Sequence, residues 1–70
     1  MNTMKEIHKE MDECIQSVPP RFRKDAEDLF EYRDDETMWD MRTVRKAWEY
    51  FLDDIVQEMS EEERNEYFFG

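Results

Sequence analysis

The chain contains almost none of the residues that turn a backbone sharply, and this restricts the folds available to it. Its only glycine is the last of 70 residues, and its only two prolines, Pro19 and Pro20, are adjacent. A β-sheet needs turn signals rich in glycine between alternating runs of β-branched and aromatic residues. Neither feature is present, whereas hydrophobic residues recur at intervals of three and four. The sequence therefore predicts an all-α protein.

Four helices are predicted from the hydrophobic spacing. The first ends at the two prolines, because proline cannot donate the next helical hydrogen bond. Pro20 suits the first turn of the second helix, where its missing N–H is not needed. The third helix carries the widest hydrophobic stripe, held over about six turns. We expect a single domain in which the first two helices pack on the third and a short fourth follows. The expected helices span about residues 4–18, 20–32, 38–59 and 61–69.

Three pairs of residues indicate where helices begin. In a capping box, a hydroxyl side chain precedes an acid by three positions, and the two side chains satisfy each other's backbone N–H groups. The first and last helices are expected to begin in this way, and a related pair is expected to cap the third. These pairs are Thr3–Glu6, Ser60–Glu63 and Thr37–Asp40.

The cysteine and histidine content limits how so short a chain can be stabilised. One cysteine cannot form an internal disulfide, which suits a reducing compartment, and a single histidine makes a structural zinc site implausible. The N-terminal segment has no apolar core, and no run approaches the ~18 apolar residues of a membrane span. We expect a cytoplasmic protein without a metal or cofactor, stabilised by helix packing or self-association.

Acidic residues are concentrated in two blocks. The chain has 20 Asp and Glu against 10 Lys and Arg, for a net charge of −10. Residues 25–40 carry eight acids against Arg33 alone, and residues 49–70 carry eight against Arg64 alone. Between them lies a basic segment with Arg42, Arg45 and Lys46. Such a chain is repelled by nucleic acid and by anionic membranes, so we expect neither as a direct partner.

The acidic blocks favour a protein partner, because clustered like charge destabilises a small fold. Carboxylates arrayed on one side of the bundle would imitate phosphates and attract the basic cleft of a nucleic-acid-binding protein. In composition the chain resembles the small acidic effectors that phages and other mobile elements make against host nucleic-acid enzymes. The main hypothesis is a DNA-mimic-like inhibitor or regulator, and the simplest alternative is a surface that keeps the protein soluble. The candidate contacts are Glu27, Asp28, Glu31, Asp34, Asp35, Glu49, Asp53, Asp54 and Glu58.

Aromatic residues provide a second hypothesis. The chain has ten, more than a three-helix core easily encloses, and five lie off or at the edges of the hydrophobic stripes. The two terminal phenylalanines either close the core or join a contact patch for a partner or a second copy. The chain would then be an antitoxin-like or adaptor-like interaction protein or a homodimer subunit, with Trp39 and Phe68 as contacts. The residues concerned are Trp39, Tyr50, Tyr67, Phe68 and Phe69, with Met4, Met38 and Met41 as adaptable neighbours.

A third alternative is enzymatic. Glu27, Asp28 and Glu31, followed by Glu49 and Asp53, resemble the paired acidic motifs of the all-α nucleoside triphosphate pyrophosphatases. The resemblance implies acids on two helices that bind Mg²⁺ at the phosphates. The second motif here has three residues between its acids where the family has two, and Asp28 replaces a glutamate. We therefore expect a binding module without catalytic activity of its own.

The remaining reactive residues have structural interpretations. His8, with Asp12 one turn away, is expected to be packed or solvated. Cys14 lies on the hydrophobic stripe of the first helix and is expected to be a buried, unreactive thiol. Two basic clusters are expected to form salt bridges to the acidic blocks. They are Arg21, Arg23 and Lys24, and Arg42, Arg45 and Lys46.

Overall fold

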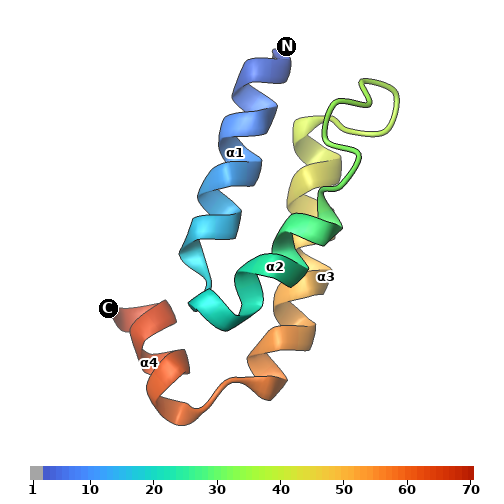
Figure 1. Ribbon diagram of the computed structural model, residues 1–70. Coiled ribbons are helices and arrows are strands. Elements are labelled where there is room, and N and C mark those ends of the chain that lie inside the picture. The colour runs from blue at the N-terminus through green and yellow to red at the C-terminus, as the bar shows by residue number, and fades with distance from the viewer. Residues whose placement is uncertain (1–2) are drawn as a thin grey trace.

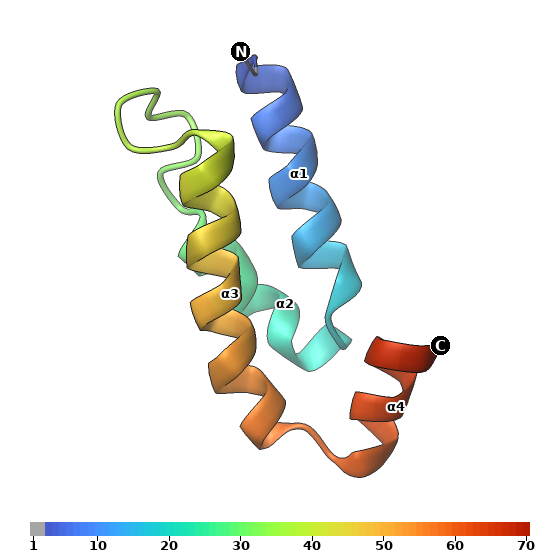
Figure 2. The ribbon, with the colours of Figure 1, turned by 180° about the vertical axis from the view of Figure 1, so that it is seen from behind.

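The computed structural model describes residues 3–70, which form four helices and no strand. Helices α1 (Met4–Ser17), α2 (Pro20–Leu29) and α3 (Met41–Glu58) pack against one another. Helix α2 runs in the opposite direction to α1 and α3, and α4 (Glu61–Phe69) turns back from the end of α3 toward the α1–α2 connection (Figures 1 and 2). The expected three-helix bundle with a long third helix and a short fourth is confirmed.

A single hydrophobic core joins the three longer helices. The hydrophobic stripes predicted for them are all buried or partly buried, and no polar or charged residue in the range 3–70 is buried. Helix α4 adds only Tyr67, which is partly buried against this core. The buried residues are Ile7, Met11, Ile15, Val18, Phe22, Ala26, Phe30, Trp39, Val44, Trp48, Ile55 and Met59.

The predicted starts of α1, α2 and α4 are confirmed. The Thr3 hydroxyl accepts a hydrogen bond from the Glu6 N–H at 3.2 Å, and the Ser60 hydroxyl accepts one from the Glu63 N–H at 3.1 Å. Both are complete capping boxes, which satisfy N–H groups that a helix leaves unpaired. Pro20 occupies the first turn of α2.

Helix α2 ends at Leu29 and not at residue 32. The N–H groups of Phe30 and Glu31 donate to carbonyls three residues back, so the helix tightens into successive turns. This change of direction buries Phe30 and leaves Tyr32 largely exposed. The expected last turn was wrong because burial of Phe30 decides the end of the helix.

Helix α3 begins at Met41 and not at residue 38. The Asp35 carboxylate accepts hydrogen bonds from the Thr37 N–H, the Thr37 hydroxyl and the Met38 N–H, so Thr37 belongs to a turn and cannot cap a helix. Asp40 caps α3 instead, accepting from the Thr43 N–H at 2.7 Å. The hydrogen bonds of the turn lower the pKa of Asp35, and those of the cap lower the pKa of Asp40. Both carboxylates are therefore held in the ionised form.

The connection between α2 and α3 closes one end of the core with aromatic rings. The Phe30 ring lies 5.3 Å from Trp39, edge to face, and 6.1 Å from Trp48 in a stacked arrangement. Trp48 in turn packs 5.1 Å from Phe51. Trp39 is only 6 % exposed, so its expected place in a surface contact patch was wrong.

Candidate protein-binding surface

The twenty carboxylates lie at the surface, and few of them are neutralised by a base. Four form ion pairs with a base among residues 3–70, and the other sixteen do not. Three of the pairs join α1 or α2 to another part of the fold through Arg33, Arg21 and Arg45. Most of the acidity is therefore free to act on a partner.

The acids of α3 do not share one face. Glu49 and Asp53 are one turn apart on one flank, and Asp54 and Glu58 are one turn apart on another. Glu49 and Glu58 differ by nine residues, which places them on opposite sides of a helix with about 3.6 residues per turn. All four are exposed, and they lie on two flanks of α3 rather than on one face.

The end of α3 that carries Asp54 and Glu58 lies beside the start of α2. The Arg21 guanidinium donates to the Glu58 carbonyl at 2.9 Å, which joins the start of α2 to the end of α3. Asp25 and Asp28 follow Arg21 at i+4 and i+7, so they share its side of α2. Helices α2 and α3 pack together and run in opposite directions (Figure 1), so we group these two acids with the two at the C-terminal end of α3. Asp25, Asp28, Asp54 and Glu58 form what we call the α2–α3 acidic surface.

The other candidate acids of the first block have different positions. Glu27 is exposed and lies away from the Arg21 side of α2, and Glu31 is exposed in the turns that follow the helix. Asp34 lies 3.2 Å from the His8 ring, and the Asp35 carboxylate is occupied by the turn that precedes α3. The structure therefore gives Asp34 and Asp35 roles within the fold.

His8 and Arg33 attach this connection to α1. The His8 Nε2 atom lies 2.9 Å from the Arg33 carbonyl, and the Arg33 guanidinium donates to the Asp12 carboxylate at 2.9 Å and to the His8 carbonyl at 3.2 Å. Asp12 therefore pairs with Arg33, and the acid beside His8 is Asp34. Arg33 is the only base of residues 25–40, and its use here leaves the acids around it without a neighbouring base.

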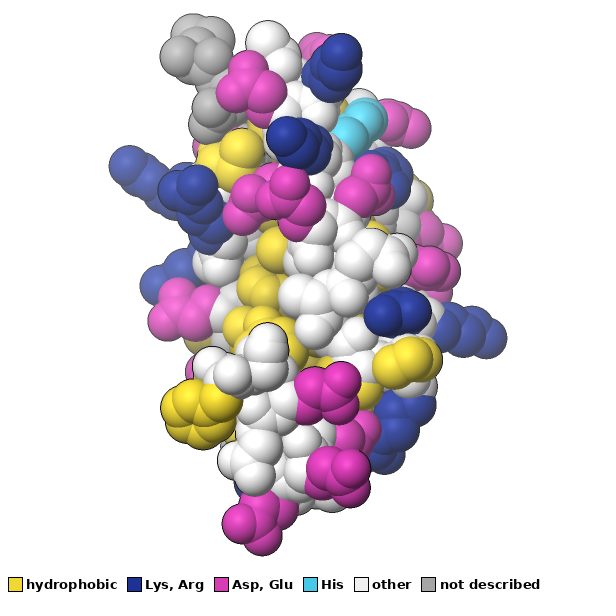
Figure 3. Space-filling view, turned by 90° about the vertical axis from the view of Figure 1, so that its left-hand side faces the viewer, with side chains coloured by type: hydrophobic (Ala, Val, Ile, Leu, Met, Phe, Trp, Pro, Cys, Tyr) yellow, Lys and Arg dark blue, Asp and Glu magenta, His cyan; other side chains and the backbone are white. Residues whose placement is uncertain are grey.

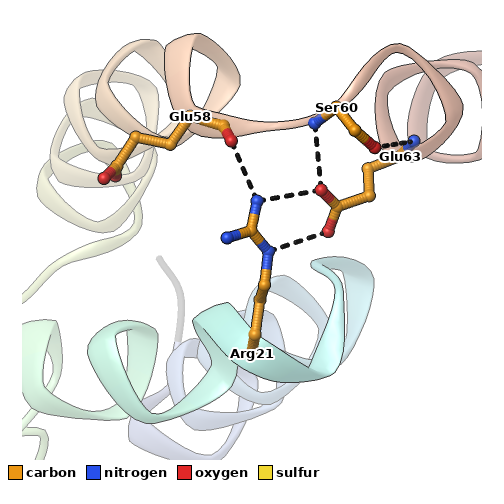
Figure 4. Close-up of polar contacts among 4 residues, drawn as sticks. All are labelled: Arg21, Glu58, Ser60 and Glu63. Carbon is orange, nitrogen blue, oxygen red and sulfur yellow. Dashed lines mark hydrogen bonds and ion pairs between the residues drawn. The ribbon is translucent and has the colours of Figure 1, made fainter.

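Helix α4 is attached to the bundle by Arg21. The guanidinium donates through Nε and Nη2 to the two oxygens of Glu63 at 3.0 and 2.9 Å, and through Nη2 to the Glu58 carbonyl at 2.9 Å (Figure 4). Glu63 also completes the capping box with Ser60. We call this arrangement the Arg21 clamp, because it joins α2, the end of α3 and the start of α4.

The clamp shifts the titration of both charged partners. Hydrogen bonds from Arg21 and the Ser60 backbone, together with the charge of Arg21, lower the pKa of Glu63 from 4.5 to about 2. The same hydrogen bond raises the pKa of Arg21 above its usual value. Glu63 therefore keeps its charge, and with it the bidentate pair, in mildly acidic solution.

A cleft of about 500 Å³ separates α4 from the α1–α2 connection. Val18, Pro19 and Tyr67 contribute apolar surface, and Glu66 and Arg23 contribute charge. Arg23 donates to the Gln16 carbonyl at 3.4 Å, while its Nε atom is buried without a hydrogen-bond partner. In Figure 3, which views the side of α1 and α4, acidic and basic side chains are mixed around a strip of hydrophobic ones, so this side is not a continuous acidic surface.

The end of α4 exposes two phenylalanines. Phe68 is 56 % exposed and Phe69 is 86 % exposed, so the interpretation in which they close the core was wrong. Tyr67 packs edge to face on Phe68 at 5.0 Å. Met38 is also exposed, whereas Met4 and Met41 pack against the core and Met1 lies outside the described residues. Phe68 and Phe69 are therefore surface residues, and their role as partner contacts stays a prediction.

Cys14 is half-buried on α1 and packs against the core. Burial, and then the negative charges of Glu10 and Glu13, raise the pKa of its thiol to about 11. The thiolate is the reactive form, so the thiol is unreactive near neutral pH, as the sequence suggested.

The basic clusters neutralise less of the acidic blocks than the sequence suggested. Arg21 does pair with Glu63, in the second block. Arg45 lies 3.9 Å from Glu10, outside both blocks. The remaining members of the two clusters form no ion pair with any residue in the range 3–70. They are Arg23, Lys24, Arg42 and Lys46.

The acids named in the pyrophosphatase resemblance are not brought together. Within residues 3–70, no group of three His, Cys, Asp or Glu side chains is placed to hold a metal ion.

No helix in this range is both long and apolar enough to cross a membrane. Comparisons of the chain with protein-family models, curated proteins and solved structures gave no match.

Proposed function

We propose that the chain is a small acidic protein-binding module that occupies the nucleic-acid-binding cleft of a basic protein, as an inhibitor or regulator of that protein. The observation that supports this proposal most directly is the α2–α3 acidic surface. Its four carboxylates are exposed and form no ion pair among residues 3–70. Glu27, on the other side of α2, and Glu31, in the turns just after its end, extend the negative charge.

The spacing of these carboxylates suits a basic cleft. Acids one helical turn apart are separated by about 5.4 Å along the axis, which is of the same order as the ~3.4 Å between successive charges along a nucleic-acid strand. Two antiparallel helices place two such rows side by side. With a net charge of −10, the chain attracts a basic partner over long range and accelerates association. The phage and mobile-element effectors that the chain resembles in composition act in this way.

The test has two stages, because the partner is not known. The immobilised chain captures proteins from a lysate of its native host at low salt, and captured proteins are eluted separately with salt and with double-stranded DNA. Charge-driven mimicry predicts that both elute the same basic protein, since salt screens the contacts and DNA competes for the cleft. A captured protein that resists both eluents contradicts the proposal.

The second stage locates the contact surface. The variant D25N/D28N/D54N/E58Q removes the charges of the α2–α3 acidic surface without changing side-chain size. The matched control E13Q/E36Q/E62Q/E66Q removes four exposed charges that have no ion pair elsewhere in residues 3–70. The first variant is expected to weaken binding of the captured protein by about a hundredfold or more and the control by much less. Equal losses would mean that net charge, and not this surface, drives binding.

One observation favours a second function. Phe68 and Phe69 project from the end of α4 next to the cleft, and exposed aromatic residues are typical of binding hot spots. The chain would then be an adaptor-like or antitoxin-like protein that binds through aromatic contacts. Such a complex would persist in high salt and would be lost in Phe68→Ala, which distinguishes it from the charge-driven module.

A further inference from the structure

A row of charged residues on α3 has an order that nothing inside the molecule explains. Arg42, Lys46, Glu49 and Asp53 follow one another at intervals of four, three and four residues, so they lie in one line along α3. All four are exposed, and none forms an ion pair with another residue in the range 3–70. Two bases come first and two acids follow. We call these four residues the α3 charge row.

This order is unfavourable within a single helix. Arg42 and Lys46 are like charges one turn apart, and so are Glu49 and Asp53, and such pairs destabilise a helix. The bases occupy the N-terminal half and the acids the C-terminal half, which is the reverse of what the helix dipole favours. An alternating order of the same four residues would have formed favourable pairs along the helix.

An antiparallel second copy reverses each of these effects. When two rows are related by a two-fold axis between Lys46 and Glu49, Arg42 faces Asp53 of the second copy and Lys46 faces Glu49 of the second copy. The symmetry repeats both contacts, so four pairs of opposite charge form and no like charges face each other. The two helix dipoles also become antiparallel. A second copy carries the same order of charges at the same spacing, so it fits in this way.

The surroundings of the row leave room for such a partner. In Figure 2, α3 lies in front of α2, and no helix covers the side of α3 that faces the viewer. Tyr50, next to the row, is 63 % exposed, and the Lys46 ammonium lies 5.6 Å from the centre of its ring. The ring adds apolar area beside the charged contacts, and aromatic residues are enriched in interfaces.

We infer that two copies of the chain associate in antiparallel fashion through the α3 charge row. The inference is independent of the proposed function, because the α2–α3 acidic surface lies on the other flank of α3 and remains free in both copies. The high net charge of each copy opposes association, so the dimer is weak. It is best measured at about 0.15 M salt, where charges more than about 8 Å apart are screened and contact pairs are less affected.

A charge-exchange experiment tests this pairing. The variants are R42E/K46E, in which the row is entirely acidic, and E49K/D53K, in which it is entirely basic. Sedimentation equilibrium and native mass spectrometry are expected to show the wild-type chain forming a species of twice its 8.8 kDa mass as concentration rises. Each variant alone is expected to dimerise at least about tenfold more weakly, because all four pairs become repulsive. An equimolar mixture of the two is expected to form a heterodimer.

A matched control separates the row from net charge. K5E/K9E makes the same change in net charge as R42E/K46E, at two exposed positions on α1. It is expected to dimerise within about twofold of the wild type and to form no heterodimer with E49K/D53K. Circular dichroism checks that each variant keeps its helices. A wild-type chain that stays monomeric up to about 1 mM, or a mixture that associates no better than its components, would overturn the inference.

Discussion

The two ends of the bundle are closed by different interactions. At the end near the α2–α3 connection, the rings of Phe30, Trp39 and Trp48 pack together in the core. At the other end, the exposed Arg21 clamp holds α4, which buries only part of Tyr67. Aromatic burial is insensitive to salt and acid, whereas an exposed ion pair is screened by salt and is lost once its carboxylate takes up a proton. One end is therefore a fixed part of the fold, and the other responds to solution conditions.

The largest loss of stability is expected for a substitution at the aromatic end of the bundle. Trp39→Ala removes a buried ring and leaves a cavity beside Phe30, which typically destabilises a protein by about 3–5 kcal/mol. Small domains have only about 5–15 kcal/mol in total, so the variant is expected to lose much of its stability to urea, followed by circular dichroism. Trp39→Phe, which keeps an aromatic ring, is expected to lose less. A loss below about 1 kcal/mol for Trp39→Ala would mean that the connection is not part of the core.

A smaller and more local effect is expected at the clamp. Arg21→Gln removes the contacts to Glu63 and to the Glu58 carbonyl, so α4 is expected to separate from the bundle while α1–α3 stay folded. Hydrogen exchange of the α4 amides should accelerate at least about tenfold, and the slowest amides of α1 and α3 should change less than about twofold. Lys24→Gln makes the same change in charge on α2 and should affect neither. Uniform acceleration in all helices would show that the ends are not independent.

Acid should have the same effect as the Arg21 substitution. The pKa of Glu63 is about 2 in the folded chain and 4.5 ordinarily, so its contribution is fully present above about pH 4.5. This contribution is lost as the pH falls from about 4.5 through about 2, where the folded carboxylate takes up its proton. NMR signals of Tyr67 are expected to report the change, and Glu63→Gln should remove that part of the pH dependence. A Tyr67 titration that is unaltered by Glu63→Gln contradicts the assignment.

The smallest effect is expected for the aromatic residues of α4. Phe69 is 86 % exposed, so Phe69→Ala is expected to change the free energy of unfolding by less than about 0.5 kcal/mol. The contrast with Trp39 tests burial directly, because both substitutions remove an aromatic ring. A large loss at Phe69 in urea denaturation would place the end of α4 in the core.

The sequence predicts most of the fold, because hydrophobic spacing and capping pairs are local signals. The stripes of α1, α2 and α3 and the two capping boxes are confirmed. The boundaries around residues 30–40 were wrong, because Asp35 bonds to Thr37 and Met38 in a local turn, and because Trp39 is buried by its contact with Phe30. Trp39 follows a turn rather than a helical stripe, so its burial has no periodic signal.

The candidate surface was harder to predict. The helical period alone places Glu49 and Glu58 on opposite sides of α3, so the division of the α3 acids into two flanks is contained in the sequence. Asp54 belongs to the same surface as Asp25 and Asp28 only because α2 packs beside α3, and this packing is a property of the fold. The Arg21 clamp links residues 42 positions apart and has no local signal beyond its capping box.

The half-buried thiol of Cys14 allows motions of the chain to be followed through its reaction with a disulfide reagent. With a pKa of about 11, only about one thiol in a thousand is ionised at pH 8 in the closed state. A disulfide reagent therefore reacts faster with a chain in which α1 has separated from its neighbours, because an exposed thiol is ionised to a greater extent at this pH. As the only cysteine, it gives a single labelling rate without further engineering. A change in that rate when a partner binds would report a change in the exposure of this part of α1.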